Sequence, residues 1–186
     1  MKKIWFTILI LLLSEIIIAQ INIERIIKYF PVKGNKIEYS GVVKYDTAYT
    51  SDFIFKNARQ WMIDNYKPDK NVLLAEDKEA GYIIGQGYFE VDINPVALLT
   101  TNSRIWFTVS IEIKEGRYRY RFYDIFYETM IAMVSDKDLK FELENFMSVN
   151  NDSNKAIKFY REVDRKFNGY ICTLKSKMLM LKRDEW

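Results

Sequence analysis

Histidine is absent from the 186 residues of the chain, and this absence narrows its chemistry more than any other feature of the composition. Without histidine, a serine or cysteine nucleophile lacks its usual base, and zinc lacks its usual nitrogen ligand. Acid–base catalysis would fall to carboxylates, lysines or tyrosines. The composition therefore excludes Ser-His-Asp and Cys-His enzymes and histidine-ligated zinc sites.

Cysteine is nearly as scarce: Cys172 is alone in the chain, so no disulfide can form within it. We expect Cys172 to pack as a small buried side chain, because a thiol nucleophile usually needs a histidine. The chain also lacks a large excess of one charge, since 28 basic residues face 25 acidic ones, and this gives no electrostatic case for binding nucleic acid. The 49% of hydrophobic residues are enough for one folded domain with a substantial core.

A signal peptide is predicted at the N-terminus, which reads MKKIWFTILILLLSEIIIAQ. Two lysines precede an apolar stretch of signal length, and Ala19 followed by Gln20 offers a cleavage point. An uncleaved membrane anchor is the alternative, but Glu15 interrupts the apolar run and would cost about 2.5–3.5 kcal/mol inside a bilayer. We therefore expect residues 1–19 to be removed, which leaves 26 basic and 24 acidic residues. The protein is then exported to the periplasm or cell envelope, or secreted, and would contact a membrane only through an uncleaved signal.

The next segments have a strand pattern followed by a helix pattern. Residues 36–45, KIEYSGVVKY, place apolar and polar side chains on opposite faces, which predicts a strand. Residues 50–69 change to a helical period, with a cap at Thr50 or Ser51 and a stop at the Lys-Pro-Asp sequence of residues 67–69. One face of this predicted helix is apolar and contains Ile54, Phe55, Ala58, Trp61 and Met62.

A pair of strands follows the helix. We predict a short strand over residues 72–75, an acidic turn over residues 77–81 and a return strand over residues 82–91. Gly81 would supply a positive φ in the turn. The acids of the turn lack the spacing of a calcium loop, so no metal site is expected there.

Two glycines, Gly85 and Gly87, fall on the same face of the return strand and leave a trough in it. The Trp61 face of the preceding helix is placed to fill this trough. The sequence GQG lacks the third glycine of a dinucleotide-binding fingerprint and lies within a strand, so we expect no phosphate loop and no cofactor.

A hairpin is predicted in residues 104–127, RIWFTVSIEIKEGRYRYRFYDIFY, with Glu115-Gly116 as its turn. The register that follows pairs Ile113 with Tyr118, Ile111 with Tyr120, Val109 with Phe122 and Ile105 with Phe126 on the core face. On the other face it pairs Glu112 with Arg119, Ser110 with Arg121, Thr108 with Tyr123 and Trp106 with Ile125. Asp124 falls on the core face opposite Phe107. Either a bulge turns Asp124 outward, which we favour, or it is a buried carboxylate with a raised pKa.

The C-terminal third contains one clear helix. The pattern of residues 135–147, SDKDLKFELENFM, fits either a short helix or an irregular excursion, and both alternatives stay open. From about Ser153 the spacing of apolar residues predicts a long helix, which Asn168-Gly169 would kink or split. The apolar positions of this helix are Ala156, Tyr160, Val163, Phe167, Tyr170, Ile171, Leu174 and Met178.

Together these elements predict an α+β fold, a single antiparallel five-stranded sheet with two helices on one face in the order β-α-β-β-β-β-α. The motifs SDFIFKNARQWM, EDKEAGYIIGQG and KEGRYRYRF resemble a bacterial family of domains of unknown function with a TATA-binding-protein-like (TBP-like) fold. The matching residues are Ala58, Trp61, Asp77, Gly81, Gly87, Gly116, Arg119 and Tyr120. The resemblance covers residues 37–127 and implies an export signal ahead of the domain, but it brings no activity and no catalytic residues.

The predicted organisation has three parts: a signal peptide over 1–19, a TBP-like domain over 36–127, and a C-terminal extension and helix over 128–186 that complete the same domain. Structural roles are expected for Ala58, Trp61, Gly81, Gly85, Gly87 and Gly116.

The candidate site is the sheet face turned away from the helices, because binding surfaces favour aromatic and arginine side chains. The candidate residues are Tyr82, Gln86, Tyr88, Trp106, Ser110, Arg119, Arg121 and Tyr123. Two alternatives stay open: an ordinary solvated face with cross-strand pairs, or a face covered by residues 128–148 or by the long helix.

We predict a non-enzymatic binding module that takes an envelope protein, a peptide or a glycan, or serves as an assembly piece. The alternative is a carboxylate-based hydrolase of envelope glycans, which needs two acids about 5–9.5 Å apart in a cleft. Nucleic-acid binding by analogy with the namesake of the fold is the least favoured, because fold alone does not set function.

Overall fold

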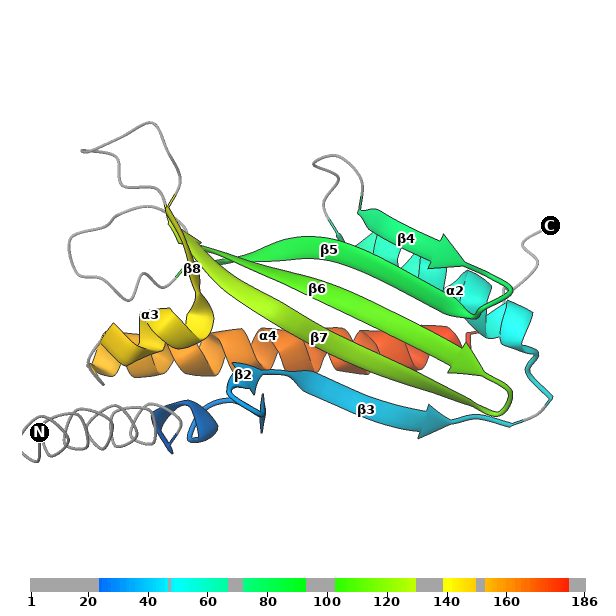
Figure 1. Cartoon of the computed structure of the whole chain (residues 1–186), viewed down its shortest axis with the longest axis horizontal. Helices are drawn as coiled ribbons and strands as arrows, with labels where there is room; N and C mark the ends of the chain where they lie inside the picture. Colours follow the sequence, from blue (N-terminus) through cyan, green and yellow to red (C-terminus); the bar gives the residue numbers. More distant parts are fainter. Residues whose placement is uncertain are drawn as a thin grey trace, which may run out of the picture.

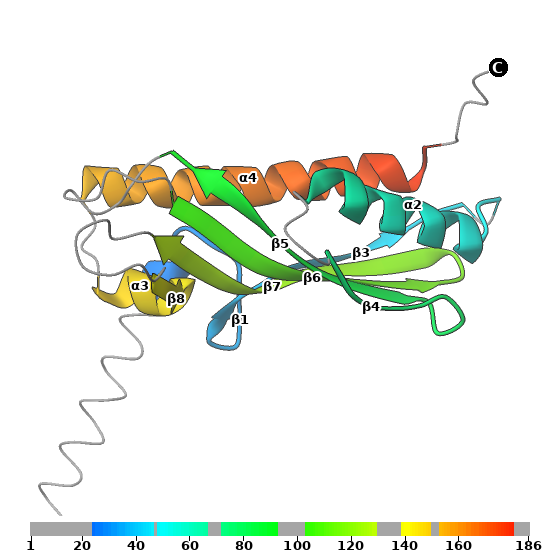
Figure 2. The ribbon, with the colours of Figure 1, turned by 90° about the horizontal axis from the view of Figure 1, so that it is seen from above.

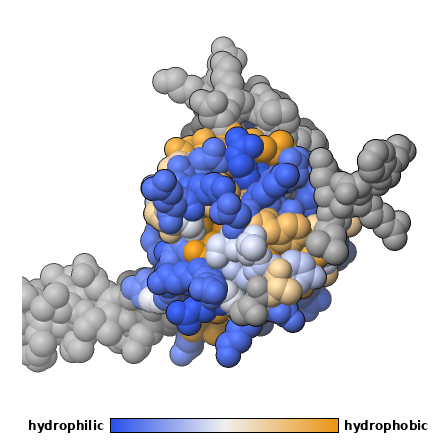
Figure 3. Space-filling view, turned by 90° about the vertical axis from the view of Figure 1, so that its right-hand side faces the viewer, coloured by the Kyte–Doolittle hydropathy of each residue, from blue (hydrophilic) through white to orange (hydrophobic). Residues whose placement is uncertain are grey.

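One twisted antiparallel sheet and two helices that cover one of its faces make up the protein (Figures 1 and 2). The computed structural model describes residues 24–46, 48–66, 72–92, 103–129, 139–149 and 153–180. The signal peptide predicted over 1–19 and the helix stop predicted at residues 67–69 lie outside these ranges. Seen from the end that carries the β6–β7 turn, the surface is mostly hydrophilic, with apolar side chains in smaller groups (Figure 3).

Within the described residues the main sheet has six strands, all antiparallel to their neighbours. Their order is β3 (Tyr39–Lys44), β7 (Arg117–Thr129), β6 (Ser103–Lys114), β5 (Tyr82–Val91) and β4 (Leu73–Asp77), and β8 (Leu139–Glu142) pairs with the far end of β7. A separate small hairpin joins β1 (Val32–Lys33) to β2 (Lys36–Ile37). The predicted α+β class is confirmed. The sheet has one strand more than predicted, because β8 forms in a segment whose pattern we left open.

The helix α2 (Ser51–Asn65) and the helix α4 (Asn154–Met178) both cover the same face of the sheet (Figure 2). Thr50 and Ser153 cap them by accepting hydrogen bonds from backbone amides. The five side chains of α2 that are buried are the five predicted. The predicted apolar positions of α4 are buried or partly buried, and Phe159, which the prediction omitted, is buried with them.

Two predictions about α4 are wrong. The helix runs unbroken through Asn168-Gly169, which do not split it. Cys172 is exposed rather than buried, because it lies beside the apolar stripe that Ile171 and Leu174 belong to and not on it. The short helix α3 (Leu143–Val149) packs on the helix side of the sheet, where Phe146 stacks on Tyr127 at 4.2 Å between ring centroids.

The trough predicted at Gly85 and Gly87 is filled, at Gly85 by Met62 of the predicted Trp61 face and at Gly87 by Tyr66. Tyr66, which follows α2, lies directly on Gly87, and a Cβ added there would overlap its ring. A Cβ at Gly85 would lie 3.0 Å from the Met62 sulfur. Trp61 packs edge-on against the ring of Tyr66 at 5.6 Å and against Phe122 of the sheet at 6.2 Å. The two glycines therefore let the end of α2 approach the sheet closely.

The hairpin turn is confirmed at Glu115-Gly116, where Gly116 has φ 69°. Gly81 has φ 70° in the β4–β5 turn, as predicted, although β4 continues to Asp77. The predicted hairpin register holds from the turn as far as Thr108 with Tyr123.

Beyond Tyr123 the predicted register is wrong, because β7 contains one extra residue there. Asp124 has φ 51° and is exposed, which confirms the bulge that we favoured. The extra residue pairs Ile105 with Tyr127 instead of Phe126, and Trp106 with Phe126 instead of Ile125. Ile125 is consequently buried, and Phe126 is on the outer face.

Two glycine substitutions test the packing of the helices on the sheet. Gly87→Ala should lower the free energy of unfolding by about 1–3 kcal/mol, because the ring of Tyr66 occupies the space of the new methyl group. Gly169→Ala is the matched control: the new Cβ meets nothing within 4 Å, and alanine is the better helix former. It should raise stability by about 0.5–1 kcal/mol. Urea unfolding of both variants is the measurement, and equal effects would contradict the packing described here.

Candidate functional site on the open sheet face

The open face of the sheet is the face turned away from α2 and α4, and the burial pattern along the strands places all of the candidate side chains predicted from the sequence on it. Each of them alternates with core residues along its strand. Arg119 is exposed, Ser110 is buried, and the others are partly buried. Their role in binding stays a prediction. The structure divides the face into an ionic group around Glu38 and Arg121, with hollows that extend toward the β6–β7 turn, and an aromatic group near β8.

The ionic group is centred on Glu38, whose side chain is only 8% exposed. Arg121 donates to one carboxylate oxygen of Glu38 at 2.8 Å, and Lys33 donates to the other at 3.2 Å. These hydrogen bonds, that of Arg121 above all, lower the pKa of Glu38 from its ordinary value to about 2. The Arg121 guanidinium also lies over the ring of Tyr123, 4.8 Å from its centroid. Arg121 is therefore held in a fixed position on the face.

Two adjoining hollows lie beside this ionic group. The larger, about 400 Å³, opens between the β4–β5 turn and strands β6 and β7, and Tyr82, Ser110, Arg121 and Tyr123 line it. The smaller, about 260 Å³, is lined by residues of β3, β6 and β7 and includes Arg119. Glu112 lines both and forms a 2.5 Å ion pair with Arg119, as the predicted register implied. Five of the eight predicted candidates line these two hollows, and Gln86, Tyr88 and Trp106 lie elsewhere on the face, so the candidates are not gathered in one place.

The aromatic group is centred on Trp106, whose ring lies 4.8 Å from that of Tyr88. The ammonium of Lys140 on β8 lies 4.8 Å from the Trp106 ring and at the same distance from Phe126. The indole N–H donates to Glu128 at 2.7 Å. Sequence reasoning missed Phe126 because the bulge moves it outward, and it missed Lys140 because β8 was not recognised. If the bulge had been placed at Asp124, the alternation of inward and outward side chains along β7 would have put Phe126 on the open face.

Gln86 lies between the two groups, opposite Thr108 on β6. The face therefore has a polar middle and two chemically different ends. The described part of the C-terminal extension does not cover it, because β8 extends the sheet at its edge and α3 packs with Tyr127 and Phe159 on the helix side.

Carboxylates are sparse in the cavities. Counting described residues only, each hollow of the open face is lined by one, Glu112, and a third cavity of about 340 Å³ between Tyr29 and α4 is lined by one, Asp164. Asp164 accepts a hydrogen bond from Tyr39 at 2.7 Å, and burial together with this contact raises the pKa of Tyr39. Among the described residues no three potential metal ligands lie together. These cavities do not present the paired acids that glycoside hydrolysis requires.

Residues 39–128 match the family described as "Domain of unknown function (DUF4468) with TBP-like fold". The chain carries a DUF4468 domain. A TBP-like protein from Parabacteroides distasonis has a similar structure, with a TM-score of 0.63 and 18% identity over 80% of this chain and 96% of that one. A DUF4468 family protein from Bacteroides ovatus gives a TM-score of 0.62 and 12% identity over 86% and 98% of the two chains.

These two structural likenesses show the fold and extend beyond the residues of the family match. They confirm the TBP-like architecture that the sequence motifs implied. No curated protein matches the chain. In the described ranges, no helix is long and apolar enough to cross a membrane.

The ion pairs of the DUF4468 domain lead to a pH prediction. Because the pKa of Glu38 is depressed, its stabilising effect is complete above about pH 4.5 and is lost as the pH falls toward 2. Glu38→Gln should lower the free energy of unfolding at neutral pH by about 1–3 kcal/mol, and its difference from wild type should shrink through that window.

Glu112→Gln is the matched control, because its partner Arg119 is exposed and the pair should contribute less than about 1 kcal/mol. Urea unfolding at neutral and acid pH is the measurement. A Glu38 variant that loses no more stability than the Glu112 variant would contradict the buried pair.

Proposed function

We propose that this DUF4468 protein is a non-catalytic binding module, exported to the cell envelope, that takes a protein, peptide or glycan on its open sheet face. The observation that carries the proposal is the arrangement of that face. A tilted aromatic pair, Tyr88 with Trp106, lies at one end, and an arginine fixed by Glu38 lies beside the hollows toward the other. Aromatic and arginine side chains held in place are what binding surfaces use, since they lose little conformational freedom on binding.

An ordinary solvated sheet face is the competing interpretation, and the aromatic group argues against it. A tryptophan on a solvated strand needs no ordered neighbours, whereas Trp106 has a tyrosine at its side, a lysine over its ring and a carboxylate on its N–H. Such an arrangement fixes the indole in one orientation. It suits stacking against a sugar ring or an apolar side chain of a partner.

The hydrolase alternative finds no support in the cavities, because each is lined by a single carboxylate. Glu112, the acid of the open face, is paired with Arg119 at the surface. Export is supported by the N-terminal sequence, in which a short apolar stretch follows two lysines and ends at Ala19.

The test replaces Trp106 and Arg119 together with alanine. Arg121 is kept, because its removal would leave Glu38 buried without its main partner and would destabilise the sheet. The control replaces Phe141 and Arg165, an aromatic residue and an arginine that lie away from the open face. Immobilised protein of each kind is exposed to an envelope extract, and bound material is quantified by mass spectrometry. The open-face variant should lose a component that wild type and control retain.

Recovery of the same component by all three proteins would refute the open-face proposal. The free energies of unfolding of wild type and the two variants should agree within about 1 kcal/mol, so that a lost partner reflects the altered face and not a lost fold.

Export has its own measurement. The intact mass and the N-terminal sequence of the protein purified from cells should show a chain that begins at Gln20, because Ala19 places a small residue directly before the cleavage point. A mature chain that still contains residues 1–19 would identify the segment as an anchor instead.

A further inference from the structure

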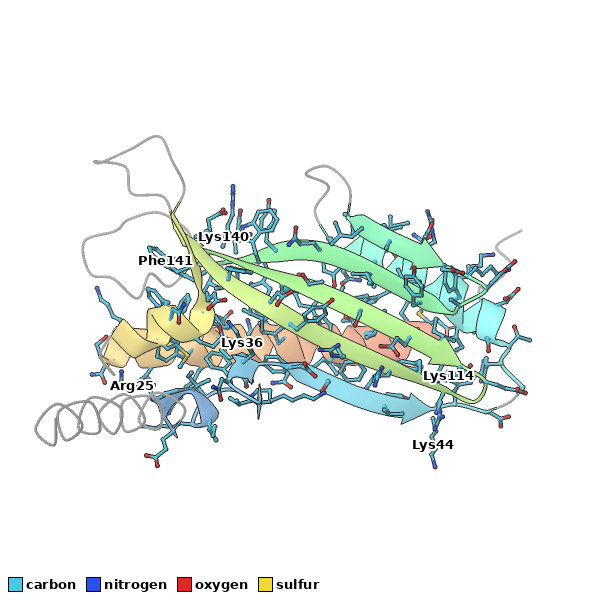
Figure 4. The ribbon with its side chains drawn as sticks, in the orientation of Figure 1. Arg25, Lys36, Lys44, Lys114, Lys140 and Phe141 are labelled. Atoms are coloured by element: carbon cyan, nitrogen blue, oxygen red, sulfur yellow. The ribbon has the colours of Figure 1, made fainter. Side chains whose placement is uncertain are left out.

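Three cations lie side by side across neighbouring strands at the turn end of the open face. Arg117 on β7 is directly opposite Lys44 on β3 and directly opposite Lys114 on β6. Figure 4 shows Lys44 and Lys114 at this end of the sheet. Lys44, Arg117 and Lys114 are called the cationic row below.

None of the ion pairs found among the described residues involves the cationic row. Glu112 lines a hollow with Lys114 and Arg117 but is paired with Arg119, and Glu38 is paired with Arg121. Like charges directly opposite one another destabilise a sheet. A lysine on an edge strand often prevents unwanted pairing with another strand, and this would explain Lys44. It does not explain Arg117 and Lys114, because they lie on interior strands.

The row begins at an open sheet edge. β3 is the last strand of the sheet on its side, and Figure 1 shows it as the lower border. The amide of Tyr45 donates to the carbonyl of Gly116 and therefore points toward the β6–β7 hairpin. Amides of successive strand residues point to opposite sides, so those of Lys44 and Val42 point away from β7 and toward the free edge. Val42 is 61% exposed, so an apolar side chain is accessible at this edge.

We propose that an extended, acidic segment of a protein partner adds to the free edge of β3 as a further strand. Its carboxylate side chain would lie beside Lys44, and an apolar side chain two residues away would lie beside Val42. This inference rests on the proposed function and names its partner class. Backbone hydrogen bonds to the edge supply affinity in this mode of recognition, and alternate side chains supply specificity. The cationic row selects an acidic strand and rejects neutral or basic ones.

A peptide strand fits these features better than other anions do. The row has three cations, fewer than the clusters of four to eight that are typical of anionic membrane surfaces. The hollow beside Val42, about 260 Å³, has room for side chains of a partner. Arginine also matches the planar geometry of a carboxylate.

The test uses a fluorescent peptide in which valine and glutamate alternate at every second position and threonine fills the positions between. Anisotropy with the full mature chain measures its affinity. Lys44→Glu should weaken binding roughly tenfold, and Val42→Thr severalfold. Lys155→Glu, an equal charge change on the exposed face of α4, should leave affinity unchanged.

Two further peptides separate strand addition from simple charge attraction. The peptide with lysine in place of glutamate should bind wild type poorly and the Lys44→Glu variant well. A peptide N-methylated at alternate amides should not bind, because it cannot pair with the edge. Equal binding of the methylated peptide, or equal losses in the Lys44 and Lys155 variants, would overturn the proposal.

Competition identifies other occupants. Displacement of the peptide by inorganic phosphate or by phosphatidylglycerol vesicles would overturn a peptide site, and concentration-dependent dimerisation blocked by Lys44→Glu would assign the edge to a second copy instead.

The outcome is separable from the proposed function: if the Trp106 and Arg119 variant loses its envelope partner while Lys44→Glu retains it, the open face binds and the strand proposal fails.

A stability measurement is independent of any partner. Arg117→Gln removes repulsion in the cationic row and should raise the thermal midpoint by about 1–3 °C at low salt. The gain should vanish at high salt, where the row is already screened. A fall in the midpoint would show that Arg117 stabilises the sheet, which contradicts an uncompensated row.

Discussion

The contact between the ring of Tyr66 and the bare backbone at Gly87 sets the distance between the helices and the sheet. Because no side chain separates them, α2 lies close enough for Trp61 to reach Phe122 and Tyr170 edge-on. The same aromatic layer continues through Phe107 and Phe167 to α4. Aromatic pairs in such geometry stabilise a core beyond the area they bury. The helices thus cover one face of the central strands, whereas β4 is mostly exposed, and the other face of the sheet is uncovered over the described residues.

That packing also determines the chemistry of the open face. Successive side chains of a strand point to opposite faces, so a side chain that packs against the helices has neighbours that point to the open face. The pair of Glu38 with Arg121 ties β3 to β7 from the outside, while Tyr39 ties the same strand to α4 from the inside through Asp164. β3 is therefore held firmly although it has one strand neighbour, and its free edge is a rigid surface.

Regular periodicity explains what the sequence predicted well. The apolar face of α2 and the hairpin register up to Tyr123 follow from spacing alone, because nothing interrupts the helical or the two-residue period there. The register beyond Tyr123 did not follow, since no glycine marks the extra residue at Asp124. For the candidate site, the alternation along each strand predicted on which face of the sheet each side chain lies. The partnership of Glu38 with Arg121, which are 83 positions apart, was not.

The bulge at Asp124 divides β7 into two stretches with separate neighbours. Residues 117–122 pair with β3 and residues 126–129 pair with β8 along the same side of the strand. A change of chain length after residue 124 alters β8 and α3 but leaves the earlier stretch and β3 in place. The segment that follows residue 124 can therefore differ between related proteins without a change in the pairing of β3 with β7. Such differences would change the residues of β8 that surround Trp106.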